Sequence, residues 1–255
     1  MKMVKDIAIE VDGLTIKGQL HLPVKKRPST HPTVCICHGI PADKSSPTSE
    51  GYPLLAEKLS REGFAALIFN FRGTRTSGGN LGLPGWTRDL KGIIDYLFTA
   101  PEVDKSHLSL LGFSAGAAVA IHAASQDSRI SCVASCASPA NFSSITEADR
   151  PQAVIDHFRN IGTIRDDIFP PSIEEWLDGF SQIKPVMYVS DITPKPLLLI
   201  HGNCDDVVPL KHAYELYEKA KEPKHLIIVD GAKHRLRDDD RAMAIVIDWL
   251  KSHCL

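Results

Sequence analysis

The sequence lacks any surplus of charge. Its 29 Lys and Arg residues are balanced by 31 Asp and Glu residues, which gives a formal net charge of −2 at neutral pH. Binding to nucleic acid or to an anionic membrane surface needs a basic excess, and the composition supplies none. Long apolar runs are missing as well, since none approaches the ~18 residues of a membrane-spanning helix. The sequence therefore predicts neither nucleic-acid binding nor a membrane span.

The sequence also lacks a secretion signal and any regular pairing of cysteines. Residues Met1 to Ile7 show neither the apolar core nor the cleavage site of a signal peptide, so we expect a cytoplasmic protein. The six cysteines are scattered and are predicted to be free thiols. Cys35 and Cys37 share one face of a predicted strand, but no second pair at zinc spacing accompanies them. We therefore expect no metal site, because structural zinc requires four converging ligands.

Internal repeats and low-complexity segments are absent, and 255 residues suit a single domain over 1–255. Short continuous apolar runs recur along the chain, as expected of parallel strands that are buried on both faces. These runs cover residues 33–38, 65–70, 107–113, 130–137, 196–201 and 225–230.

Helical patterns separate these runs. One of them places Trp86, Leu90, Ile93, Ile94 and Leu97 on a single face. Near the start of the chain, alternating segments flank Asp12-Gly13, which predicts a hairpin of antiparallel edge strands. The alternation of strands and helices predicts an α/β fold: a mostly parallel, doubly wound sheet of about eight strands with helices on both faces.

One segment interrupts the alternation. Residues 141–193 are too many for a plain loop, and they contain two helical patterns separated by Pro170-Pro171. We interpret them as a helical cap inserted over the strand ends. Its apolar side chains, among them Phe158, Trp176 and Phe180, either wall a substrate pocket or pack the insertion onto the remaining helices.

The segment Gly112-Phe113-Ser114-Ala115-Gly116 has the pattern of a nucleophile elbow. It follows an apolar run and opens a stretch of small residues, and the flanking glycines permit the close packing that a sharp strand-to-helix turn requires. In such a turn the Ser114 hydroxyl is exposed and the Ala115 NH faces a developing oxyanion. The alternative is that Ser114 serves only as a helix N-cap.

An acid and a base follow in the order that accompanies such an elbow. Asp205 and Asp206 come just after the apolar run 196–201, and His234 follows the Gly231 turn after the last predicted strand. Serine, aspartate and histidine are the residue types needed to activate a hydroxyl. Adjacent residues of an extended segment point in different directions, so only one of the two aspartates faces the histidine. His234 could alternatively be a surface side chain in a basic loop.

Three further side chains stand at predicted strand ends. His38 and His201 each precede a glycine, and we expect both to brace backbone turns. Arg72 either meets a carboxylate-bearing substrate or, as we expect, ties a loop through backbone carbonyls. After His38, the Ile40 NH is positioned to act as a second oxyanion donor, since Pro41 has none.

Together these motifs resemble the α/β-hydrolase fold, and the resemblance covers nearly the whole chain. The segments His38–Lys44, Asn70–Gly73 and Ser77–Asn80 are similar to the branch of carboxylesterases, feruloyl esterases and monoacylglycerol lipases. The His-Gly-Gly-Gly motif of another esterase branch is missing, which favours an oxyanion hole of Ile40 and Ala115. In the resembling family the acid stands in a His-Gly-x-x-Asp segment, and this position is Asp205.

The resemblance implies a serine hydrolase that cleaves small to medium acyl or aromatic esters through an acyl-enzyme on Ser114, with Asp205 and His234 completing the triad and no cofactor. A peptidase or amidase on the same fold is the alternative, as is a ligand-binding protein derived from a hydrolase. The expected partner is a small-molecule ester, and a homodimer is left open. Acyl and alcohol preferences depend on pocket dimensions that the sequence does not give.

Overall fold

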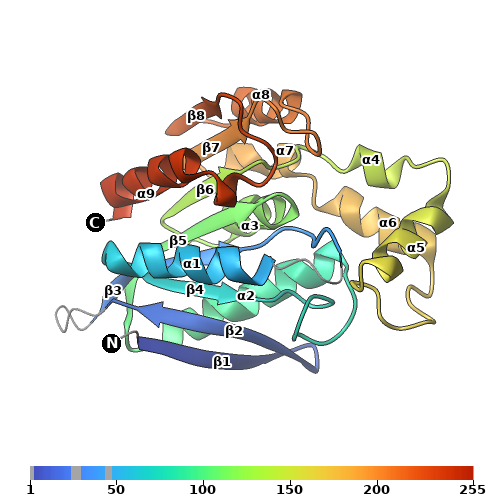
Figure 1. Cartoon of the computed structure of the whole chain (residues 1–255), viewed down its shortest axis with the longest axis horizontal. Coiled ribbons are helices and arrows are strands. Elements are labelled where there is room, and N and C mark those ends of the chain that lie inside the picture. Colours follow the sequence, from blue (N-terminus) through green and yellow to red (C-terminus); the bar gives the residue numbers. More distant parts are fainter. Residues whose placement is uncertain (1–2, 24–29, 44–47, 255) are drawn as a thin grey trace.

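A computed structural model describes residues 3–23, 30–43 and 48–254. Lys44 and the side chain of Cys254 therefore lie outside the described part of the chain. Among the described residues the strands form one eight-stranded sheet (Figure 1). The strands are β1 Met3–Val11, β2 Leu14–Leu22, β3 His31–Cys37, β4 Ala65–Phe69, β5 Val103–Phe113, β6 Cys132–Cys136, β7 Leu197–Gly202 and β8 Lys224–Val229.

The first two strands form the predicted hairpin. Asp12 and Gly13, with φ values of 52° and 74°, make a two-residue turn in which both central residues are left-handed, as a tight hairpin turn requires. The spatial order of the sheet is β1-β2-β4-β3-β5-β6-β7-β8. β2 pairs antiparallel with β1 and β4, whereas every later neighbour pairs in parallel. Only β1 of the hairpin is therefore an edge strand, and the predicted mostly parallel sheet is confirmed.

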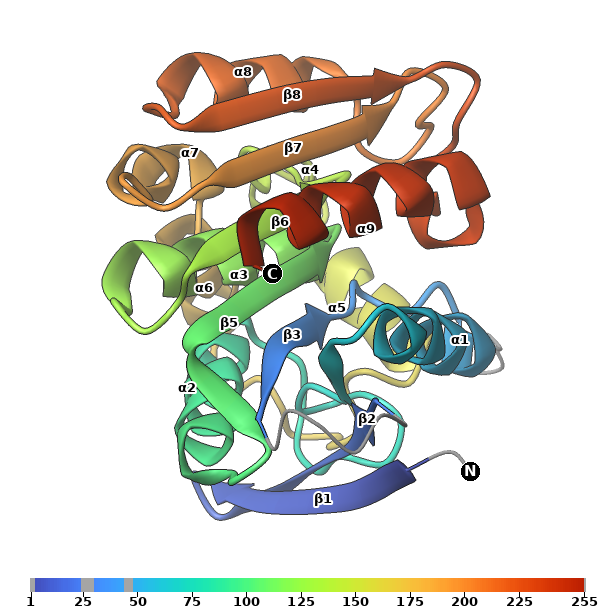
Figure 2. The same ribbon diagram turned by 90° about the vertical axis from the view of Figure 1, so that its left-hand side faces the viewer.

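Helices cover both faces of the sheet, because the parallel strands are apolar on both sides (Figure 2). The longer ones are α1 Thr48–Arg61, α2 Leu83–Thr99, α3 Ala115–Gln126, α8 Lys211–Lys219 and α9 Asp240–Cys254. α1 and α9 pack on one face, and α2, α3 and α8 pack on the other. The apolar face predicted for α2 is buried at all five of its residues, so Trp86 is a core residue. The five are Trp86, Leu90, Ile93, Ile94 and Leu97. Within the described residues, none of the helices has the length and apolar character needed to cross a bilayer.

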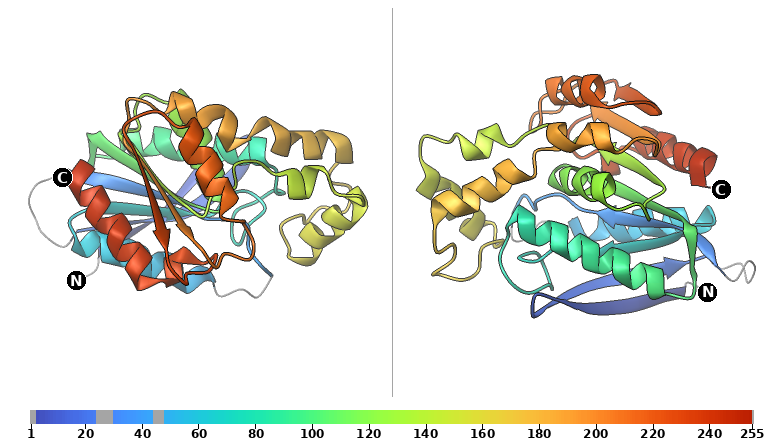
Figure 3. Two further views of the ribbon diagram at one scale, coloured as in Figure 1. Left: turned by 90° about the horizontal axis from the view of Figure 1, so that it is seen from above. Right: turned by 180° about the vertical axis from the view of Figure 1, so that it is seen from behind.

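The predicted interruption of the alternation contains short helices: α4 Ser143–Thr146, α5 Pro151–Asn160, α6 Ile173–Gln182, α7 Pro185–Tyr188 and the 3₁₀ turn η1 Val189–Asp191. We call residues 141–193 the insertion. α4, α5 and α6 lie beyond the carboxyl ends of the parallel strands, at the right of Figure 1 and the left of the rear view in Figure 3. Trp176 and Phe180 pack in the main core, while Ile168 and Met187 are exposed.

Arg72 shows where the sequence-based expectation was wrong. Among the described residues its guanidinium binds carboxylates and no backbone carbonyl: it forms an ion pair of 2.7 Å with the fully buried Asp89 and one of 2.9 Å with Asp12. The Arg72 carbonyl instead accepts a hydrogen bond from the indole NH of Trp86. A planar guanidinium has several NH donors that point in different directions, so it can bind two carboxylates at once. Arg72 therefore anchors the loop after β4 and is not directed at a substrate.

Candidate active site

Ser114 occupies the turn between β5 and α3. Its φ of 53° and ψ of −127° are strained for a residue with a side chain, and the Ser114 NH is held by the Cys136 carbonyl of β6 at 2.9 Å. The flanking glycines are required by space: a Cβ on Gly112 would lie 2.4 Å from Ala117 Cα, and one on Gly116 would lie 2.2 Å from the His38 carbonyl oxygen. The Ser114 side chain makes no capping hydrogen bond to α3, so the N-cap alternative does not describe its hydroxyl.

His234 reaches this hydroxyl from the loop after β8. Its Nε2 lies 3.0 Å from Ser114 Oγ, and its Nδ1 lies 2.8 Å from Asp205 Oδ2. Because an ionised carboxylate can only accept a hydrogen bond, Nδ1 carries the proton and Nε2 is free to accept one from the serine hydroxyl. The three side chains that the sequence places far apart thus form one hydrogen-bonded chain at the carboxyl ends of β5, β7 and β8.

Asp205 is the aspartate that faces His234. Its carboxylate is fully buried, and Oδ1 accepts the backbone NH groups of Val207 and Val208 at 2.9 and 2.8 Å. Burial opposes ionisation of Asp205, but the hydrogen bonds from His201, His234 and Val208 outweigh it and hold the pKa of the carboxyl well below its usual range. Asp206 is exposed and lines the cleft that also contains Ser114.

His201 and Asn203 take part in this arrangement in ways that the sequence did not reveal. His201 Nε2 contacts both Asp205 Oδ2, at 3.1 Å, and the Val208 carbonyl, at 2.8 Å, so it braces the acid as well as the turn. Asn203 ties the loop after β7 to the loop after β8, because its side chain accepts from the Gly231 NH and donates to Asp230. These contacts fix the position of Asp205 relative to His234.

The loop after β3 brings Ile40 to the same place. Gly39 packs directly on the serine, since a Cβ there would lie 2.9 Å from Ser114 Cβ. His38 braces this loop as predicted: its Nδ1 donates to the Gly39 carbonyl at 2.7 Å, and its Nε2 accepts the Phe71 NH at 3.1 Å. Burial lowers the pKa of His38 to about 4, so its imidazole is neutral at neutral pH. On the other side of Ser114, Ala115 opens α3, and the first NH groups of a helix have no partner within it.

Comparison with known families decides where the chain belongs. The BD-FAE family model matches residues 19–220, which is most of the chain. The chain belongs to the BD-FAE family. The Escherichia coli O157:H7 protein YfhR is 27% identical over 226 residues, covering 88% of this chain and 70% of YfhR.

Solved structures similar to this BD-FAE protein agree with its fold. The α/β hydrolase GrgF from Penicillium sp. sh18 has a TM-score of 0.77 at 18% identity, with 99% of each chain covered. The Pyrococcus furiosus esterase Pf2001 has a TM-score of 0.70 at 23% identity, covering 100% of this chain and 94% of the other. The predicted α/β-hydrolase fold is confirmed.

The BD-FAE protein has a cleft of about 1680 Å³ above Ser114, which we call the Ser114 cleft. The loops that carry Ser114, Ile40 and His234 form its floor, and the insertion forms a wall with apolar side chains. These wall side chains are Phe142, Ile145, Val154 and Phe158. Of the three aromatic residues named from the sequence, only Phe158 lines the cleft; Trp176 and Phe180 pack behind it. Sequence patterns mark a residue as apolar but do not say which side of a helix faces the cleft.

The described residues of this BD-FAE protein contain no group of three His, Cys, Asp or Glu side chains that could hold a metal ion. Cys35, Cys37, Cys132 and Cys136 are buried in β3 and β6, Cys204 is exposed, and none of these five described cysteines is in a disulfide. Free thiols at these positions agree with the expectation from the sequence.

Proposed function

We propose that this protein is a serine hydrolase that cleaves carboxylic esters of small to medium acyl or aromatic groups through an acyl-enzyme on Ser114. The hydrogen-bonded chain Ser114–His234–Asp205 at the floor of the Ser114 cleft carries the proposal. The family and the esterase among its structural neighbours support a hydrolase, and the apolar wall of the cleft supports an ester with an apolar part. The insertion acts as a cap that excludes water from the reacting atoms.

The reaction follows from the positions of the protons. His234 Nε2 takes the Ser114 proton as the hydroxyl oxygen attacks the ester carbonyl, and Asp205 stabilises the imidazolium that forms. The Ala115 and Ile40 NH groups bind the oxyanion of the tetrahedral intermediate. The carbon–oxygen bond to the alcohol then breaks, and the alcohol leaves with the proton from His234. Water repeats the sequence on the acyl-enzyme, which releases the acid and restores Ser114, so the chemistry uses no cofactor.

A labelling experiment and a substrate panel test the proposal. A fluorophosphonate probe should modify the protein at Ser114, as mapped by peptide mass spectrometry, because only an activated serine attacks such probes readily. The panel contains p-nitrophenyl esters from acetate to long acyl chains, methyl ferulate, a monoacylglycerol and matched p-nitroanilides. Faster cleavage of the anilides than of the esters would favour the amidase alternative. Absence of both labelling and turnover would favour a ligand-binding protein and contradict the proposal.

The pH dependence of kcat/KM should show a single ionisation on the acid side. The depressed pKa of Asp205 keeps its carboxylate charged, and the pKa of about 4 keeps His38 neutral, so neither changes charge between pH 5 and 8. Histidine is the side chain that ordinarily titrates there, and the protonated base cannot accept the serine proton. We expect log kcat/KM for a p-nitrophenyl ester to fall with a slope of one as the pH decreases.

A flat profile over this range would contradict His234 as the base, and a slope of two would mean that a second group must also be deprotonated. The cytoplasmic location and the single domain expected from the sequence stay predictions, and the homodimer stays open.

A further inference from the structure

Arg75 has an unusual backbone conformation. Its φ is 46°, in the left-handed region where glycine is unstrained and a long side chain is disfavoured. The residue stands in the loop between β4 and α2, which also contains Gly73 and Gly79 at positive φ. Strained non-glycine residues persist where the surroundings fix them, and they concentrate at functional sites. The conformation of Arg75 is therefore typical of a residue with a functional role.

The surrounding structure holds this loop firmly. The Ser77 hydroxyl donates to the Asn70 carbonyl at 2.6 Å and accepts the Lys17 NH at 3.0 Å. From the insertion, Arg165 donates to the Arg75 carbonyl at 2.8 Å and to the Ser77 carbonyl at 2.9 Å. The backbone of Arg75 is thus clamped from both sides, and its guanidinium extends from a fixed point.

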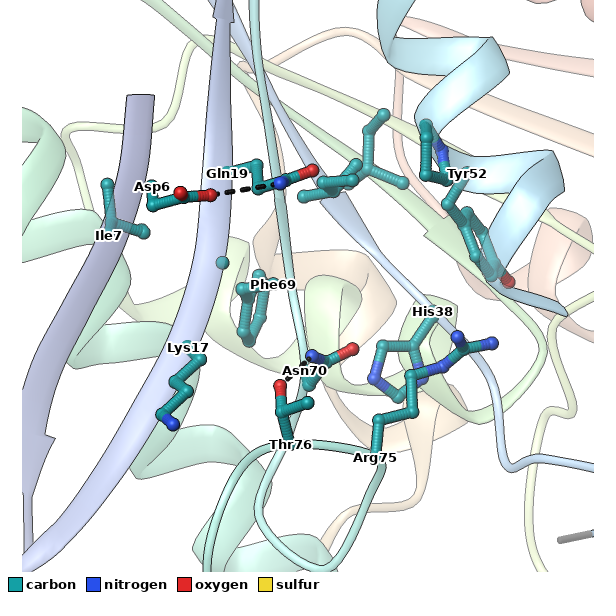
Figure 4. A pocket seen from close by; sticks show the side chains of 14 residues that line it. Asp6, Ile7, Lys17, Gln19, His38, Tyr52, Phe69, Asn70, Arg75 and Thr76 are labelled. Atoms are coloured by element: carbon teal, nitrogen blue, oxygen red, sulfur yellow. Dashed lines mark hydrogen bonds between the residues drawn. The ribbon is translucent and has the colours of Figure 1, made fainter. Parts of the chain in front are cut away.

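The Arg75 side chain lies between two hollows. Together with His38 and Tyr52 it lines the Ser114 cleft and also a neighbouring hollow of about 380 Å³. Figure 4 shows the second hollow, with the Arg75 guanidinium beside the His38 ring and pointing toward Tyr52. His38 adjoins Gly39, which packs on Ser114. A substrate bound at Ser114 therefore has Arg75 at one side of its site, while the apolar wall belongs to the insertion.

A second guanidinium lies near the first. Arg237, in the 3₁₀ turn η2 Leu236–Asp238, is centred 4.9 Å from the Tyr52 ring and also lines the Ser114 cleft. Burial lowers the pKa of Arg75. Tyr52 opposes this shift, while the positive charge of Arg237 adds to it, because the two guanidinium groups repel each other. The Arg237 side chain is only 10% exposed. Its Nε forms a long ion pair of 3.5 Å with Asp238 Oδ1 but has no hydrogen-bond partner among the described residues. An anion between the two guanidinium groups would relieve this repulsion.

Arg75 and Arg237 account for most of the positive excess of the Ser114 cleft. Among the described lining residues, six are Arg or Lys and three are Asp or Glu; without these two arginines the numbers are four and three. Charged side chains of one sign in a concave surface raise the local concentration of the opposite charge. Arg75 and Arg237 therefore form the cationic side of the cleft.

We propose that the Ser114 cleft selects esters that carry an anionic group, a carboxylate or a phosphate, and that Arg75 is the residue that recognises it, with Arg237 beside it. The inference rests on the proposed ester hydrolysis and names its substrate class. The ester carbonyl lies at Ser114, the apolar part contacts the insertion, and the anion lies on the Arg75 side. Planar guanidinium groups match the oxygen pairs of both anions.

Matched substrates test this selectivity. The neutral reference is p-nitrophenyl butyrate; p-nitrophenyl hemiglutarate adds a carboxylate to the acyl side, and the ester of 3-phosphonopropionate adds a phosphonate. A third pair, phenyl butyrate and m-carboxyphenyl butyrate, places the carboxylate on the alcohol side. We expect kcat/KM for at least one anionic member to exceed that of its neutral partner by about tenfold to a hundredfold, as for a charge-assisted hydrogen bond.

The Arg75→Gly variant separates recognition from folding. Glycine adopts φ 46° without strain, so the melting temperature should change by no more than about 4 °C. In the variant the ratio of kcat/KM for the anionic esters to kcat/KM for their neutral partners should fall toward one, mainly because KM rises for the anionic esters. Arg75→Lys should restore part of the preference. Arg150→Gln removes another cleft cation, on the insertion, and should leave most of the preference in place.

Each outcome bears on a different step. Equal rates for anionic and neutral members of every pair in the wild type would overturn the inference, while ester hydrolysis itself stands. A preference that survives in Arg75→Gly, or that falls equally in Arg150→Gln, would overturn the role of Arg75. Failure to cleave any ester, neutral or anionic, would instead refute the proposed function. The carboxylate and phosphonate arms distinguish which anion the site prefers.

Discussion

Replacement of Ser114 by alanine should reduce ester hydrolysis by about 10⁴- to 10⁶-fold, because no other group can form the acyl-enzyme. The backbone strain at position 114 is held by the Cys136 carbonyl and by the close packing of Gly112 and Gly116, none of which involves the hydroxyl. Alanine therefore fits the same turn, and the protein should keep its melting temperature. Initial rates with p-nitrophenyl esters and mass spectrometry of the fluorophosphonate adduct measure the effect.

A serine from the same cleft provides the matched control. Ser144 lines the Ser114 cleft from α4 of the insertion and is exposed. Ser144→Ala should keep its rate within about threefold of the wild type, since a surface substitution away from the reacting atoms changes little. If Ser114→Ala retained more than a hundredth of wild-type activity while Ser144→Ala lost it, the nucleophile would have to be sought in the insertion.

Local patterns in the sequence predicted the sheet and placed Ser114 and His234 at strand ends. Continuous apolar runs of strand length identify β3 to β8, and glycines two positions on either side of Ser114 identify the turn. The choice of Asp205 over Asp206 came from the family resemblance, and the structure shows what orients the Asp205 carboxylate. Backbone NH groups of Val207 and Val208 hold one oxygen, which turns the other toward His234.

Long-range pairing between loops was not predictable in this way. The sequence indicated that Arg72 stands near the site, but only the structure shows that the buried Asp89 on α2 takes its charge. Arg75, three residues later, lines the cleft instead, and the contact of its loop with Arg165 joins residues 90 positions apart. His201 was expected to brace a turn, and its second contact, with Asp205, depends on the curvature of the loop after β7. Such contacts depend on the direction of side chains in loops, and loops have no periodic sequence pattern from which that direction could be predicted.

The Asp205→Asn variant should lower kcat by about 10⁴-fold with little change in KM, because it traps the histidine in the wrong tautomer. The geometry determines the orientation of the new amide. Its oxygen must occupy the Oδ1 position, where two backbone NH groups donate, so its NH₂ group occupies the Oδ2 position facing His234 Nδ1. An NH₂ donor there requires an unprotonated Nδ1, which moves the ring proton to Nε2. That nitrogen then points a proton at Ser114 Oγ and cannot accept one.

The neighbouring aspartate separates this effect from a simple loss of charge. Asp206→Asn removes the same charge one residue away, at an exposed position in the same cleft, and should alter kcat by less than about threefold. In Asp205→Asn the NH₂ group also meets His201 Nε2, which already donates to the Val208 carbonyl, so some loss of stability should accompany the loss of rate. Thermal unfolding of both variants, measured beside kcat, distinguishes the two contributions. Should Asp206→Asn prove the crippling change while Asp205→Asn remains active, the acid has been assigned to the wrong residue and the orientation of His234 must have another cause.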